Sequence, residues 1–232
     1  MTDSTARPLC ILLPGTDGTG AFFADLHRAL DGYDVRVVSY PQYGEQSYER
    51  LGRLILPTLP RDRDYVLIGE SFGGPLAIWL AVHVARKPVK MVLGATFAAS
   101  PFGALGRAIT PLLVIGQWLP LWTWQINLIL FNNNNRQMAE TIHENVKPIA
   151  RTVLLDRVRS VLTCDMRGWL SQVGLPVLCL NAAKDRLLPP WLARRFEGLP
   201  NATMVGLDLP HMIFQSDADN ITRQHLLPFL RR

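Results

Sequence analysis

The fold of this chain is decided by the stretch Gly69-Glu70-Ser71-Phe72-Gly73-Gly74. It follows the apolar run Tyr65–Ile68, which is typical of a buried strand, and precedes the apolar run Pro75–Val82, which is typical of a helix. A serine at a sharp turn between a strand and a helix is exposed as a nucleophile, and flanking glycines let neighbouring elements pass close to it. The helix N-terminus also favours negative charge at the serine. The motif is short and also fits an ordinary turn, so the rest of the chain must supply a base, an acid and an oxyanion hole.

Length and composition predict one globular domain over residues 1–232. The net charge of +5 comes from scattered arginines rather than a basic patch, so we expect no nucleic-acid partner. The segment Met1–Arg7 lacks the apolar stretch of a signal peptide. The three cysteines have no metal-binding spacing, and their odd number favours a reducing, cytoplasmic location. We therefore expect no metal site.

Six short apolar runs alternate with helical patterns along the chain. Runs of this kind are typical of strands that are buried on both faces, as in a parallel sheet with right-handed crossovers. The sequence therefore predicts an α/β fold with a trimmed, mostly parallel sheet of about six strands flanked by helices. The expected strands are Leu9–Leu13, Val35–Tyr40, Asp64–Ile68, Val89–Ala95, Pro176–Asn181 and Thr203–Leu207.

The alternation is interrupted over residues 100–173, after the fourth expected strand. Residues 108–135 carry no charge, and the stretch is longer than the ~20 residues of a transmembrane helix. Pro111 and Pro120 divide it, however, and a membrane span here would separate the two halves of the sheet. We instead expect a helical cap with an apolar underside, followed by amphipathic helices over residues 137–147 and 149–164. We expect this cap to make at most a weak contact with a membrane surface.

A serine nucleophile needs a base and a group that orients the base. His211 follows the last expected strand, so it emerges at the carboxyl edge of the sheet, where Ser71 also lies. Asp185 follows the fifth strand and has the same position relative to the sheet. Asp208 is a rival for the acid because it precedes His211 by three residues. The other histidines fall on predicted helices and are less suited: His27, His83, His143 and His225.

An oxyanion hole needs two preorganised backbone N–H groups. We expect one from Phe72, the residue after the nucleophile, and the other from Thr16 in the loop after the first strand. A phosphate-binding loop is the alternative for this glycine-rich segment. The sequence of residues 15–20 does not match Gly-x-Gly-x-x-Gly, and it lacks the lysine of a Walker loop.

These features together resemble the α/β-hydrolase superfamily over nearly the whole chain. The resemblance rests on Leu-Pro-Gly-Thr at residues 13–16, on Gly-Glu-Ser-Phe-Gly-Gly at residues 69–74, and on the strand-end positions of Asp185 and His211. The size and the position of the cap are similar to small bacterial carboxylesterases of the pimeloyl-acyl-carrier-protein methyl ester esterase type. The first loop is also similar to that of plant phytyl-ester-type acyltransferases. Pro14 departs from the histidine that is frequent before the loop glycine. The usual antiparallel strand pair has no room before Leu9.

The resemblance implies a serine hydrolase that cleaves carboxylic esters or thioesters with an apolar acyl chain through an acyl-enzyme intermediate. Ser71, Asp185 and His211 would be catalytic, the N–H groups of Thr16 and Phe72 would bind the oxyanion, and no cofactor would be needed. We expect a small-molecule or carrier-bound acyl ester as substrate. Two alternatives are an acyltransferase with the same triad and a weakly catalytic ligand-binding module. Trp118, Trp122 and Trp124 are expected to line the acyl pocket, although they could equally form the core of the cap.

Overall fold

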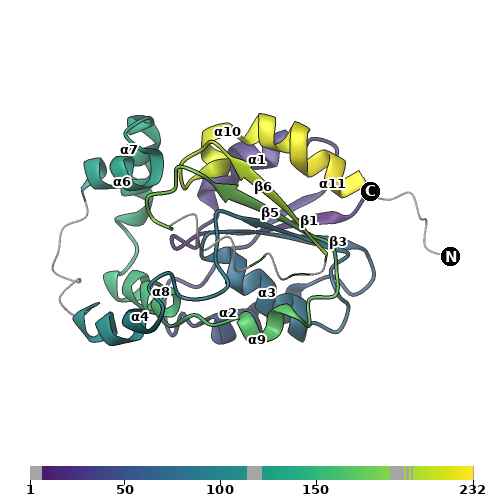
Figure 1. Ribbon diagram of the computed structural model, residues 1–232, viewed down its shortest axis with the longest axis horizontal. Helices are drawn as coiled ribbons and strands as arrows, with labels where there is room; N and C mark the ends of the chain where they lie inside the picture. The colour runs from purple at the N-terminus through teal and green to yellow at the C-terminus, as the bar shows by residue number, and fades with distance from the viewer. Residues whose placement is uncertain (1–6, 114–121, 189–195, 197–198, 200, 232) are drawn as a thin grey trace.

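A computed structural model of the protein describes residues 7–113, 122–188, 196, 199 and 201–231. Its strands form one six-stranded sheet in the order β2-β1-β3-β4-β5-β6, and every neighbouring pair is parallel (Figure 1). The predicted α/β fold with a trimmed sheet is therefore confirmed. The strands are β1 (Leu9–Leu13), β2 (Val35–Val37), β3 (Tyr65–Glu70), β4 (Lys90–Gly94), β5 (Val177–Ala182) and β6 (Ala202–Leu207).

The register of the sheet brings the carboxyl ends of its central strands to one edge. Leu13 of β1 pairs with Gly69 of β3, and Glu70 of β3 pairs with Gly94 of β4. On the other side of β4, Ala182 of β5 pairs with Leu207 of β6. Because all the strands run in the same direction, the loops that follow β1, β3, β5 and β6 leave the sheet at this edge.

Helices cover both faces of the sheet (Figure 1). One apolar core lies on the side of α2, α3 and α9, and a second lies on the side of α1, α10 and α11. Short 3-10 turns span Ala21–Phe23 and Leu56–Thr58, and a π-helical stretch spans Thr222–Leu226. The helices on the two faces are α1 (Ala24–Ala29), α2 (Tyr48–Ile55), α3 (Gly73–His83), α9 (Arg167–Leu170), α10 (Ile213–Ile221) and α11 (Leu227–Arg231).

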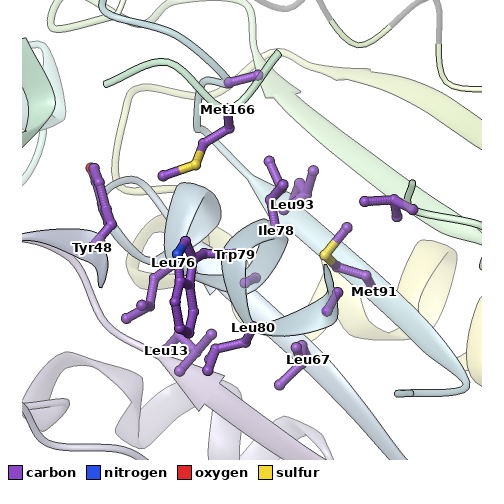
Figure 2. Packing of buried hydrophobic residues seen from close by; sticks show 14 of the residues in the cluster. Leu13, Tyr48, Leu67, Leu76, Ile78, Trp79, Leu80, Met91, Leu93 and Met166 are labelled. Carbon is purple, nitrogen blue, oxygen red and sulfur yellow. The ribbon is translucent and has the colours of Figure 1, made fainter. Parts of the chain in front are cut away.

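Helix α3, which follows Ser71, is buried along most of its length. Residues 73–81 are all buried, because the sheet covers one side of the helix and α2 and α9 pack against the other. Figure 2 shows how Leu76, Trp79 and Leu80 of this helix meet Leu13 and Leu67 of the sheet. A helix that is apolar all round is expected in such a position. The packing fixes the start of α3, and therefore the turn that carries the serine.

Between β4 and β5, the described helices α4, α6, α7 and α8 lie at one end of the molecule and are called the cap here, whereas α9 packs against α3 (Figure 1). Helices α6 and α7 pack on each other around a small apolar core of their own, which includes Ile126, Phe131 and Ile142. Asn132 ends α6 in the left-handed conformation, with φ of 54°. None of the described helices is long and apolar enough to cross a membrane. The cap contains α4 (Ala104–Ile109), a 3-10 turn (Thr110–Leu112), α6 (Thr123–Phe131), α7 (Arg136–Val146) and α8 (Arg151–Thr163).

Most element boundaries lie within one or two residues of the sequence-based expectation, but two differ by three residues or more. Strand β2 ends at Val37, although the apolar pattern continues to Tyr40. Beyond the strand, Tyr40 turns inward and its hydroxyl donates a hydrogen bond of 2.9 Å to the carbonyl oxygen of Pro14. The chain after His211 becomes helical at Ile213, seven residues before the helix expected from Asn220. Both differences arise from contacts with distant segments, which local periodicity does not record.

We expect Trp79→Ala to lower the free energy of unfolding by about 3–5 kcal/mol, because it empties a large volume in a close-packed core. The Trp79 side chain is 4% exposed and stacks on His83 at a ring distance of 4.0 Å. Trp124→Ala is the matched control, because that side chain is 58% exposed. Urea unfolding followed by circular dichroism measures both. Equal losses in the two variants would contradict the assigned packing.

Candidate active site

Ser71 lies in a strained turn between β3 and α3. Its φ is 52°, a left-handed conformation that side chains other than glycine rarely adopt. Its N–H donates to the carbonyl oxygen of Gly94 on β4 at 2.9 Å, and its own carbonyl oxygen accepts from the N–H of Gly74 at 3.1 Å. A side chain at Gly73 would place Cβ 2.1 Å from the carbonyl oxygen of Leu13 on β1, so only glycine fits there. These contacts hold the serine at the edge of the sheet.

Ser71, His211 and Asp185 form a continuous chain of hydrogen bonds. The Nε2 atom of His211 lies 2.9 Å from Oγ of Ser71, and its Nδ1 atom lies 2.6 Å from Oδ2 of Asp185. The side chains of His211 and Asp185 are 2% and 3% exposed. Neutral imidazole with its proton on Nδ1 can therefore donate to Asp185 and accept the proton of Ser71.

The loop after β5 fixes the carboxylate of Asp185. Its Oδ1 atom accepts hydrogen bonds from the N–H groups of Leu187 and Leu188 at 2.8 and 2.7 Å, which leaves Oδ2 for His211. The rival carboxylate, Asp208, is exposed and forms a salt bridge of 2.7 Å with Lys184. The geometry thus places Asp185, rather than Asp208, against the histidine.

The loop after β1 lies beside the serine. Pro14, Gly15 and Thr16 line the same cavity as Ser71 and His211. Within the described part of the chain, the N–H groups of Thr16 and Phe72 donate to no other protein group. Phe72 precedes the first residue of α3, so its N–H belongs to the free donors at the helix start. Both amides are therefore free to bind a developing oxyanion.

A cavity of about 270 Å³ opens at Ser71 and His211 and extends between the sheet edge and the cap. Most of the lining surface is apolar, although Asp17, Glu70, Gln125 and Gln215 also line the cavity. Helices α6, α7 and α8 each supply part of the apolar wall, and Phe22, Phe23 and Met212 supply another part from the sheet side. The aliphatic residues from the cap are Ile126, Ile129, Leu130, Ile142, Val146, Leu154 and Val158.

Two of the three tryptophans that were predicted to line the acyl pocket lie in the described residues, and neither of them lines this cavity. Trp122 and Trp124 are 51% and 58% exposed and stack on each other at a ring distance of 6.1 Å, beside a separate surface groove. The polar and apolar residues of α6 are not separated onto opposite faces, and the helix turns Gln125, Ile126, Ile129 and Leu130 rather than the tryptophans toward the cavity. Trp118 lies outside the described residues.

Sequence reasoning did not identify the aliphatic wall or the environment of Glu70. The spacing of Leu154 and Val158, one helical turn apart, is the signal that could have located the wall on α8.

Glu70 is 3% exposed and accepts hydrogen bonds from Nε2 of Gln215 at 3.0 Å and from the N–H of Phe214 at 3.4 Å. Burial raises the pKa of Glu70 to about 7, although these bonds and the nearby His211 oppose the shift.

The sequence of this chain is similar to those of known proteins. Residues 10–224 match the model of the alpha/beta hydrolase family. In Arabidopsis thaliana, "Phytyl ester synthase 1, chloroplastic" is 28% identical over 178 residues, which are 72% of this chain and 24% of that protein. The chain therefore spans about a quarter of the length of this relative.

Solved structures show the same fold. The esterase EaEST from Exiguobacterium antarcticum has a TM-score of 0.83 at 16% identity, with 98% of this chain and 93% of the esterase covered. The enol-lactonase from Burkholderia xenovorans LB400 has a TM-score of 0.79 at 17% identity, with 97% of this chain and 92% of the enol-lactonase covered. MenH from S. aureus has a TM-score of 0.74 at 18% identity, with 99% of this chain and 95% of MenH covered. From the family match and the shared fold, the chain belongs to the alpha/beta hydrolase family.

Proposed function

We propose that this protein is a serine hydrolase that cleaves carboxylic esters or thioesters with an apolar acyl chain. The observation that carries the proposal is the hydrogen-bonded chain from Ser71 through His211 to Asp185 at the mouth of an apolar cavity. A nucleophile, a base and an orienting acid are the groups that acyl transfer to water requires. The family relationship supports a hydrolase, and the cavity supports the apolar acyl group.

In the proposed reaction, Oγ of Ser71 attacks the ester carbonyl carbon while Nε2 of His211 takes the hydroxyl proton. The carbonyl oxygen becomes an oxyanion and accepts hydrogen bonds from the N–H groups of Thr16 and Phe72. His211 then gives its proton to the leaving alcohol or thiol, which leaves an acyl-serine ester. A water molecule, deprotonated by His211, attacks this ester. Return of the proton to Ser71 releases the carboxylic acid and restores the enzyme.

The alternative acceptor is an alcohol in place of water, which would make the protein an acyltransferase. Two observations favour keeping this candidate. The cavity is predominantly apolar, and a curated relative is named as a phytyl ester synthase. Product analysis with an ester donor and added long-chain alcohols distinguishes the two reactions, because only the transferase forms a new ester in preference to the free acid.

The remaining expectations extend the same proposal. We assign the protein to the cytoplasm, where its free, buried thiols are compatible with reducing conditions. Burial raises the pKa of Cys10 and Cys179 to about 12, so neither thiol competes with Ser71 as a nucleophile at neutral pH. We also propose one functional unit over residues 1–232, with residues 100–173 as a cap that selects the acyl chain and makes at most a weak contact with a membrane surface.

Glu70 presents an electrostatic conflict within the proposed site. It adjoins the nucleophile, and a full negative charge there would oppose the negative charge that develops on the substrate. Its raised pKa leaves much of the carboxyl group protonated near neutral pH. Its contacts with Phe214 and Gln215 tie the turn to helix α10. We therefore assign Glu70 a structural part and no proton-transfer step.

We expect Ser71→Ala to lower kcat for p-nitrophenyl esters by a factor on the order of 10⁴ or more, because it removes the attacking atom. Asp185→Asn should lower kcat by a factor on the order of 10⁴, because it favours the wrong tautomer of His211. Asp208→Asn is the matched control and should change kcat less than about threefold, since Asp208 contacts Lys184. Initial-rate kinetics on purified variants measures all three.

Activity that survives in Ser71→Ala would refute the mechanism. An Asp208→Asn variant as inactive as Asp185→Asn would refute the assignment of the acid. A wild-type protein that neither hydrolyses esters nor reacts at Ser71 with a fluorophosphonate would instead favour the ligand-binding module.

The cavity predicts how the rate depends on acyl-chain length. Each methylene group that enters it contributes about 0.8 kcal/mol, so kcat/KM should rise about fourfold per methylene until the cavity is full. Val158→Phe narrows the cavity and should shift the optimum to shorter chains while activity on acetate esters is retained. Leu155→Phe is the matched control on the same helix, because Leu155 faces another groove. An unchanged optimum in Val158→Phe would exclude this cavity as the acyl site.

We expect Glu70→Gln to alter the pH dependence of stability. The pKa of Glu70 in the folded protein is about 7, against a usual value of 4.5, so folding favours the protonated form. The stability associated with this proton is complete below about pH 4.5 and is lost as the pH rises through 7. Relative to Glu70→Gln, the wild type should lose on the order of 3 kcal/mol across this window. Urea unfolding at pH 5 and pH 8 tests this, and a difference that stays constant or has the opposite sign would contradict it.

A further inference from the structure

Arg157 of helix α8 is the largest fully buried side chain that the structure describes. Its guanidinium group lies against the loop that follows β1. Nη1 donates to the carbonyl oxygens of Thr16 and Asp17 at 2.9 and 2.6 Å, and Nη2 donates to the carbonyl oxygen of Pro41 at 3.0 Å. Nε donates to Oε1 of Gln46 at 2.9 Å. Removing a charged guanidinium from water is costly, so its retention among neutral acceptors calls for a specific role.

The loop is shaped around this guanidinium. Gly18 has φ of 66°, and a Cβ atom there would lie 2.5 Å from Nη1 of Arg157. Tyr40 holds the neighbouring carbonyl groups. Its hydroxyl donates to the carbonyl oxygen of Pro14 at 2.9 Å, and its N–H donates to the carbonyl oxygen of Gly18 at 2.7 Å. The carbonyl oxygens of Pro14, Thr16, Asp17 and Gly18 are therefore all engaged. The N–H of Thr16 is left as a donor at the cavity that Ser71 shares.

Arg157 is itself held in place by its own helix. The residue before it, Asp156, accepts a hydrogen bond of 2.7 Å from the N–H of Gln46. Ser160 donates to the carbonyl oxygen of the same glutamine at 3.1 Å. Gln46 is fully buried, so this arrangement is closed to solvent. The contacts fix α8 against the sheet domain and place the guanidinium at a defined position under the loop.

We propose that Arg157 is a positioning residue for the oxyanion hole. By holding the carbonyl oxygens of Thr16 and Asp17, it fixes the two peptides that follow the Thr16 N–H. The peptide that carries this N–H has the carbonyl group of Gly15, which accepts from the N–H of Gly18 at 3.1 Å, and Gly18 packs against the guanidinium. Arg157 thereby keeps the Thr16 N–H aimed at the developing oxyanion. The cap helix α8 thus controls the rate of the chemical step as well as the acyl chain that enters. The inference rests on the proposed hydrolase function. A planar fork that serves several carbonyl groups at once is a geometry that lysine cannot reproduce.

The test compares Arg157→Lys with Arg159→Lys, an exposed position on the same helix. Titration of Ser71 with a fluorophosphonate first gives the concentration of folded, reactive sites in each preparation. We expect Arg157→Lys to lower kcat per reactive site by about 10- to 100-fold, because small displacements of catalytic groups have effects of this size. KM should change less than about threefold, because the acyl cavity is intact. Arg159→Lys should match the wild type in both constants.

A second measurement separates positioning from folding. A trifluoromethyl ketone with a fitting alkyl chain forms a hemiketal oxyanion on the serine, so its affinity should fall by the same factor as kcat/KM. The affinity for the free carboxylic acid product should stay within about threefold. Gln46→Met leaves Arg157 in place and removes the acceptor at its Nε, together with the hydrogen bonds that Gln46 donates to the carbonyl oxygens of Tyr43 and Gly44. We expect a smaller kcat loss from it. The double variant with Gln46→Met and Arg157→Lys should have nearly the same kcat as Arg157→Lys alone, because both substitutions act through the guanidinium group.

The outcomes distinguish the two proposals. A wild-type kcat per reactive site in Arg157→Lys, with only fewer reactive sites, would overturn the positioning role and leave the hydrolase intact. A rise in KM alone would overturn it as well. If Arg157→Lys does not fold, Gln46→Met decides by the same criteria. Activity retained in Ser71→Ala would remove the proposed function itself, and the inference with it.

Discussion

The structure depends on one strained residue, the serine that joins β3 to α3. A left-handed backbone at a residue with a side chain costs on the order of 1–3 kcal/mol and persists only where the surroundings leave no alternative. Here the backbone of β1 closes against Gly73, and β4 accepts the N–H of Ser71. The burial of α3 between the sheet and its neighbouring helices prevents the turn from relaxing. The close packing of this core therefore serves the proposed chemistry, because it holds Ser71 beside His211.

The parallel sheet then determines where the partners of the serine must lie. Asp185 and His211, the proposed acid and base, come from loops far apart in the sequence, but each loop leaves the same edge of the sheet. The loop after β1, which carries the proposed oxyanion donor Thr16, leaves this edge as well. The proposed catalytic arrangement can thus be built from short loops, provided that the strands stay in register.

The sequence predicted those parts of the structure that local patterns encode. Apolar runs ended by glycine or proline located the strands, and the motif around Ser71 located the turn. The choice between Asp185 and Asp208 was not encoded locally, since both aspartates follow a strand. The N–H groups of residues 187 and 188 hold Asp185 toward the histidine, whereas Lys184 binds Asp208 at the surface. The position of Arg157 was equally hidden, because arginine is usually exposed and its acceptors lie over a hundred residues away.

The cap is attached to the sheet domain in two different ways. Helix α8 is held by buried hydrogen bonds that reach the oxyanion loop, whereas α6 and α7 pack around a small apolar core of their own. Apolar contacts tolerate exchange of one hydrophobic residue for another far better than a buried polar network tolerates loss of a partner. Within one cap, the α6–α7 pair is therefore the part that evolution or engineering can replace to obtain a new substrate range. On the proposed mechanism, replacement of α8 would also disturb the oxyanion loop and therefore the reaction itself.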